Sequence, residues 1–174
     1  MIEEIQCSAL FDYTFTTDLS GNSYLKDSIY IGHSYDSIVH SPKIIKADNK
    51  YKVDVGFVGS FFKERLSVFE NLLNKGYSSF LSGILDDSMK EVSNNLVKSI
   101  RPNIKSNEEL PYLYSGAKFS LNFTRRSKGI HSDDLDISLP STQQSITLRM
   151  VEILASGGVL ITDETSELKS LLVD

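Results

Sequence analysis

The sequence contains no tryptophan, four prolines and a single cysteine, Cys7, so no disulfide can form within the chain. A chain without disulfides is typical of a reducing compartment. Its 18 basic and 23 acidic side chains give a formal charge of −5, which argues against a protein that holds nucleic acid by net positive charge. Because it has neither a run of about 18 apolar residues nor a secretion signal, we expect a cytoplasmic protein without a transmembrane helix.

The composition is that of a globular chain. Of its 174 residues 40% are hydrophobic and 24% charged, which suits one domain, or one domain with an appendage. The first fifty residues mix short apolar pieces with turn formers, which indicates strand fragments and connections. Residues 46–52 form a polar, lysine-rich run, which predicts a linker or a solvated loop.

From Val53 onward, patterns typical of strands and helices alternate. Short apolar runs predict strands at 53–58, 77–83, 118–123 and 159–162. Apolar residues at helical spacing predict helices at 62–75, 86–100, 107–116, 145–156 and 165–172. Gly76 stands where a left-handed helix cap is expected. The long polar segment 124–144 predicts a loop, and loops of that length are often functional.

This alternation predicts the fold class. Strands joined through helices pair in parallel with right-handed crossovers, so we expect an α/β, doubly wound, Rossmann-like parallel sheet flanked by helices. The chain opens without a clear first element and stops at a helix. We therefore expect it to be part of a longer protein.

The first candidate site is the turn after the strand at 53–58. Ligands of open parallel sheets bind at the carboxyl ends of the strands. Gly59 and Ser60 form the turn, and Lys63 and Arg65 follow as cations that could neutralise a phosphate. The alternative is an ordinary turn with solvated cations. No dinucleotide glycine fingerprint or P-loop lysine is present.

The second candidate is the pair Arg149 and Glu152, three residues apart on one helix. A surface ion pair without function is the alternative. However, apolar residues surround Glu152 in this helix, and a carboxylate there is costly unless it has a partner. A ribose diol is a suitable partner, because a carboxylate accepts two hydroxyl hydrogen bonds well.

Three ordered segments resemble glycosyltransferases of the CgeB type. Residues 53–60 with Arg65 resemble the start of the C-terminal domain in that group, and 114–123 and 149–158 resemble its two later motifs. Residues 11–18 are similar to the segment before the interdomain connection. The likeness implies the C-terminal, donor-binding half of a GT-B fold, a fold in which two Rossmann-like domains face a cleft.

The resemblance also implies roles for individual residues. Glu152 would bind the donor ribose, and Arg149 would assist at the diphosphate. The other residues implied to line the diphosphate site are Gly59, Ser60 and Arg65, together with the backbone amides of Ser145, Ile146 and Thr147. Related group 1 transferases often place a glutamate eight positions before the ribose-binding one; here Gln144 stands there.

By the same likeness, residues 1–52 are a remnant of the N-terminal domain and linker, and 53–174 are a nucleotide-sugar-binding domain that is incomplete at its C-terminus. The implied donor is a nucleoside diphosphate sugar, and the acceptor is an unknown glycan, lipid or protein. No other cofactor, and no nucleic acid, is expected. Because acceptor-side residues are absent, no catalytic residue is assigned, and this chain alone is expected to bind donor without turnover.

The remaining signals are weaker. Asn122, after a strand, could reach the ligand cleft or cap the turn. His33 and His40 are isolated, which favours solvated or core histidines. A Ser- and Asp-rich loop supplies potential ligands by chance, so we expect no metal at His131, Asp133, Asp134 and Asp136. A non-catalytic α/β ligand- or protein-binding module remains the alternative to a transferase.

Overall fold

The computed structural model describes residues 10–17, 19, 25, 27–85, 92–102, 104, 106–124 and 145–171. The chain forms two compact units. The first unit comprises residues 1–34, 124–148 and 163–174, and the second comprises 35–123 and 149–162. None of the described helices is both long enough and apolar enough to cross a bilayer.

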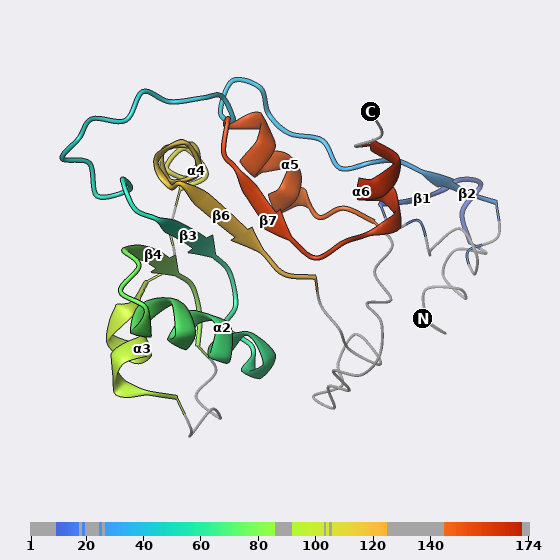
Figure 1. Ribbon diagram of the computed structural model, residues 1–174. Helices are drawn as coiled ribbons and strands as arrows, with labels where there is room; N and C mark the ends of the chain where they lie inside the picture. Colours follow the sequence, from blue (N-terminus) through green and yellow to red (C-terminus); the bar gives the residue numbers. More distant parts are fainter. Residues whose placement is uncertain are drawn as a thin grey trace. The chain divides into compact units, whose positions relative to one another are not determined.

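The second unit is built on a five-stranded parallel sheet (Figure 1). Its strands, in spatial order, are β5 (Ile100–Arg101), β4 (Ser79–Ser82), β3 (Val55–Val58), β6 (Phe119–Asn122) and β7 (Leu160–Thr162). Every neighbouring pair runs parallel. The chain moves outward from β3 in one direction and then returns to build the other half, so the predicted doubly wound, Rossmann-like sheet is confirmed.

Helices cover both faces of this sheet. They are α2 (Lys63–Asn74), α3 (Asn94–Ser99), α4 (Leu110–Gly116) and α5 (Leu148–Ala155). Phe80 packs with α4 and α5 in one core cluster, whereas its neighbour Leu81 packs with α2 and α3 in the other. Successive side chains of a strand point to opposite faces, so the two clusters lie on opposite sides of the sheet. Figure 1 shows the same division.

Several element boundaries differ from the sequence-based prediction, and helix α4, for example, begins at Leu110 and not at residue 107. Helix α3 begins only at Asn94, because the Ser93 side chain caps it by accepting from the Leu96 amide at 3.3 Å. Ile100, predicted to be the last helical residue, instead pairs with Leu81 in the unpredicted strand β5. Helix α5 begins at Leu148 and not at residue 145. Residues 86–91 lie outside the described part of the chain.

The first unit contains a separate pair of parallel strands, β1 (Thr14–Thr16) and β2 (Ser28–Tyr30), and the helix α6 (Ser166–Leu171). The strand fragments expected in the first fifty residues are thus present. Buried Glu167 of α6 accepts hydrogen bonds from the Tyr30 hydroxyl and, at 2.8 Å, from the Ile146 amide. This bond engages the backbone just before α5. The loop expected at 124–144 lies outside the described residues beyond Thr124.

Candidate functional site

The turn after β3 brings two predicted site residues together. Gly59 has φ +153°, and a Cβ atom there would lie 3.1 Å from Nη1 of Arg149 and 3.2 Å from its Nη2. The guanidinium of Arg149 therefore lies against the glycine backbone at the carboxyl end of β3. The missing side chain is what allows this close approach.

Arg149 is held in place by aromatic neighbours. Its guanidinium carbon is 6.0 Å from the centre of the Phe57 ring, and its side chain hydrogen-bonds the hydroxyl of Tyr114. Tyr114 is buried, and this burial is the main reason that its pKa is raised. A cation fixed in this way at the end of a parallel strand can meet an anionic ligand without first being ordered.

Glu152 follows one helical turn after Arg149. Its side chain is 12% exposed, and the Nε2 atom of His40 lies 3.6 Å from its Oε1. Burial raises the pKa of the Glu152 carboxyl group, while the charges of His40 and Arg149 act in the opposite direction. The sequence led us to expect that the Glu152 carboxylate needs a partner, and it has two such neighbours, His40 and Arg149. It remains an acceptor for hydroxyl groups.

Arg65 lies in the same turn but is engaged by the protein itself. Its side chain is buried and donates to the carbonyl oxygens of Ser60 at 3.0 Å and Phe123 at 3.2 Å. Its guanidinium also lies 4.8 Å from the centre of the Phe62 ring. These contacts join the β3–α2 turn to the end of β6. Its predicted role at a diphosphate stays a prediction.

Asn122 is buried at the end of β6. Its Nδ2 donates to Oγ1 of Thr162 at 3.0 Å, which links the carboxyl ends of β6 and β7. This contact accounts for the residue structurally. A role at the ligand stays a prediction, as it does for Ser60, which is exposed.

The other predicted residues precede α5 and belong to the first unit. Ser145 Oγ accepts from the Leu19 amide, and the Ile146 amide donates to Glu167. Ser145 to Thr147 are not helical, so the first turn of α5 begins after them. Their predicted role in phosphate binding is neither supported nor opposed by these contacts.

Sequence reasoning did not select His40 or Tyr114 for the site. Tyr114 stands in one of the motifs already noted, so its position could have suggested it. His40 gave no such signal, because it lies 112 positions before Glu152. Its burial, at 7% exposure, agrees with the expectation of a core histidine.

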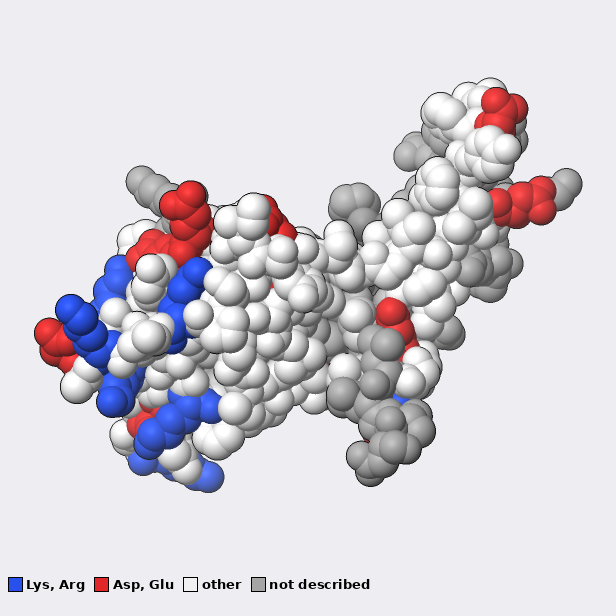
Figure 2. Space-filling view, turned by 90° about the horizontal axis from the view of Figure 1, so that it is seen from above, with Lys and Arg blue, Asp and Glu red and all other residues white. Residues whose placement is uncertain are grey.

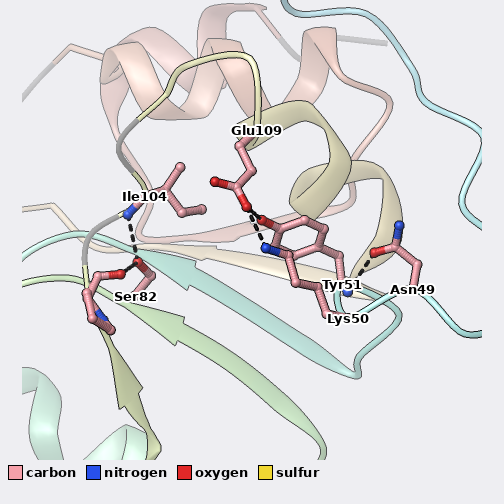
Figure 3. A network of polar contacts seen from close by, with 7 residues as sticks. Asn49, Lys50, Tyr51, Ser82, Ile104 and Glu109 are labelled. Carbon is pink, nitrogen blue, oxygen red and sulfur yellow. Dashed lines mark hydrogen bonds and ion pairs between the residues drawn. The ribbon is translucent and has the colours of Figure 1, made fainter.

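A polar network lies elsewhere in the second unit (Figure 3). The Glu109 carboxylate accepts from Nζ of Lys50 at 2.6 Å and from the buried Tyr51 hydroxyl. Burial raises the pKa of Tyr51 to about 12, and the Lys50 hydrogen bond is the main cause that lowers the pKa of Glu109. The network joins the segment before β3 to the start of α4.

The lysines of the 46–52 run are solvated, because Lys46, Lys50 and Lys52 are exposed, whereas Tyr51 of the same run is buried. Figure 2 shows Lys and Arg side chains with acidic ones between them toward the left of the view. Such mixed charge offers no strong field of one sign.

No group of three potential metal ligands occurs among the described residues. The four candidates between His131 and Asp136 lie outside the described ranges, so the structure does not test the expectation made for them.

Comparison with known proteins gives the family. A search of curated proteins found no match. The family model described as glycosyl transferase-like matches residues 52–174, which include the whole sheet together with Gly59, Arg149 and Glu152. The chain therefore belongs to the glycosyl transferase-like family, and its general role is glycosyl transfer.

Proposed function

We propose that residues 53–174 bind a nucleoside diphosphate sugar, and that the protein transfers this sugar to an acceptor as CgeB-type glycosyltransferases with the GT-B fold do. The observation that carries the proposal is the placement of Arg149 against Gly59 with the half-buried Glu152 one turn later. The proposal includes a cytoplasmic location, supported by the single cysteine.

The two side chains suit adjacent parts of one ligand. Three residues of α-helix rise about 4.5 Å, so Arg149 and Glu152 are near neighbours on α5. In a nucleoside diphosphate the ribose is bonded directly to the diphosphate. A cation at the strand end fits the diphosphate, and the carboxylate that follows fits the ribose hydroxyls.

The same arrangement suits the chemistry of transfer. Departure of the nucleoside diphosphate develops negative charge on its oxygens. A guanidinium already held by Phe57 and Tyr114 stabilises that charge with little reorganisation.

Calorimetry and thermal shift with a panel of nucleoside diphosphates test the proposal. Glu152→Gln keeps the size of the side chain but removes its charge. We expect it to weaken binding by about 1–3 kcal/mol, because ribose hydroxyls lose a charged acceptor. Glu108→Gln, which changes an exposed glutamate of the same unit, is the matched control and should leave affinity unchanged.

The outcomes separate the proposal from its alternative. Stabilisation by no nucleoside diphosphate would favour a non-catalytic binding module. Binding that is equal in the parent and in Glu152→Gln would refute the ribose assignment while leaving donor binding in place.

A further inference from the structure

His40 is an unusual buried residue in the second unit. It is 7% exposed, and neither of its ring nitrogens has a hydrogen-bond partner within the described part of the chain. Buried polar atoms in folded proteins are nearly always hydrogen-bonded, so an exception of this kind calls for a functional explanation. The polar atom recorded near it is Oε1 of Glu152, 3.6 Å from Nε2.

Local structure fixes the position of His40. Asp36 organises the preceding turn: its carbonyl oxygen accepts from the His40 amide at 2.7 Å, and its Oδ1 accepts from the Ile38 amide at 2.8 Å. On the other side, Pro42 packs against Gly157, where a Cβ atom would lie 3.2 Å from the proline Cγ. The histidine is therefore held next to Glu152 from both directions along the chain.

A second anchor follows directly. The amide of Lys43 donates to Oγ of Ser115 at 2.9 Å, and that hydroxyl donates to the Ser156 carbonyl at 2.8 Å. The segment that carries His40 is thus tied both to α4 and to the end of α5, the helix that carries Glu152.

We infer that His40 is a positioning residue for Glu152, and that it holds the carboxylate oriented for the donor ribose. This inference rests on the proposed function. One carboxylate oxygen faces the imidazole, which leaves the other for ribose hydroxyls. The titratable or charged groups recorded around Glu152 are His40 from the preceding segment, Arg149 from its own helix and Tyr114 from α4.

The sign of the effect follows from charge. Burial raises the pKa of Glu152, and His40 opposes that rise. Without His40 the carboxyl group should take up a proton at a higher pH. Only the ionised form accepts from both ribose hydroxyls. As the pH is lowered, nucleotide binding by a variant without His40 should therefore begin to weaken at a higher pH than binding by the parent.

The test uses the full chain with His40→Ala, His40→Gln and, as the matched control, His33→Ala, which removes a histidine of the first unit. Carbon-13 NMR follows the Glu152 carboxyl across pH without ligand. Calorimetry follows the affinity for a nucleoside diphosphate sugar, whose diphosphate does not titrate near neutral pH. Glu152→Gln gives the baseline without this carboxyl.

We expect His40→Ala to raise the pKa of Glu152 and to weaken binding about tenfold at pH 7, with a larger loss at lower pH. His40→Gln should recover part of the affinity at neutral pH but keep the raised pKa, because it donates without charge. It also provides the test if His40→Ala does not fold. His33→Ala should match the parent.

An unchanged Glu152 pKa in both His40 variants would overturn the inference. If Glu152→Gln weakens binding but the His40 variants do not, the inference is wrong and the proposed function stands. If the parent binds no nucleotide sugar, the proposed function fails, and the role of His40 at the ribose fails with it.

Discussion

Gly83 lies beside the turn that forms the candidate site, and its replacement gives a sharp test of the structure. The residue has φ +157°, and a Cβ atom there would lie 1.8 Å from the carbonyl oxygen of Gly59. No real Cβ atom approaches a backbone oxygen so closely. Gly83→Ala therefore requires the β3–α2 turn to move.

The cost can be compared with that at Gly76, which ends α2. Gly76 also has a positive φ, +78°, but nothing lies within 4 Å of its missing Cβ. Alanine there costs about 1–2 kcal/mol for the left-handed backbone. It recovers about 0.4–1 kcal/mol because the unfolded chain has less freedom. The net loss for Gly76→Ala is then about 1 kcal/mol.

Gly83→Ala carries the same small gain but larger costs. A backbone conformation that only glycine adopts readily costs about 1–3 kcal/mol, and forcing an extra carbon into a packed site costs about 1–3 kcal/mol more. Subtracting the gain leaves a loss of about 3 kcal/mol. Domains of this size unfold with about 5–15 kcal/mol, so the variant should still fold at low temperature.

Urea denaturation followed by circular dichroism measures both variants against the parent. We expect Gly83→Ala to lose about 2 kcal/mol more than Gly76→Ala, with similar slopes against urea. Equal losses would mean that Gly83 does not lie against Gly59 as described. The contact on which the geometry of the turn depends would then be refuted.

Two further predictions concern polar groups of the second unit. The Lys118 ammonium, followed by Ser78, lowers the pKa of Asp54 to about 2. Because this pKa is lowered in the folded state, the ionised carboxylate stabilises the protein above about pH 4, and this stabilisation is lost as the pH falls toward 2. In Asp54→Asn the urea midpoint should therefore depend less on pH over that range. An unchanged pH profile would contradict the ion pair. Tyr51→Phe removes the hydroxyl that donates to Glu109 and should lower the free energy of unfolding by about 1–2 kcal/mol. Its ultraviolet titration should lose a tyrosine that ionises near pH 12, and retention of that transition would show that the raised pKa belongs elsewhere.

The parallel sheet was predictable because four of its strands are short apolar runs closed by turn residues. Strand β5 was missed because it consists only of Ile100 and Arg101, and its pairing with β4 depends on where the chain lies in space. The start of α3 was placed too early because periodicity alone does not reveal that the Ser93 side chain caps the helix that begins at Asn94. Local patterns therefore located the sheet better than the helix ends.

At the site, the sequence led to Gly59 and Arg149 separately, and the fold brings them together. The contact was foreseeable in part, because both residues belong to ordered motifs of one family. The approach of His40 to Glu152 was not, because it depends on a turn set by Asp36 and on the packing of Pro42. Contacts made between distant segments by single side chains leave no periodic trace in the sequence.

The two arginines near the turn show why position matters more than residue type. From the sequence, Arg65 follows closely after a predicted strand and Arg149 stands on a later helix, and the family resemblance implies a role at the diphosphate for both. In the fold, Arg65 is buried with its donors directed to the Ser60 and Phe123 carbonyl oxygens, and these bonds offset the cost of burying its charge. Arg149 is less buried and lies on the glycine side of the turn. This difference supports Arg149 more strongly than Arg65 as the group that meets a diphosphate, and it gives Arg65 the separate task of keeping the turn in shape.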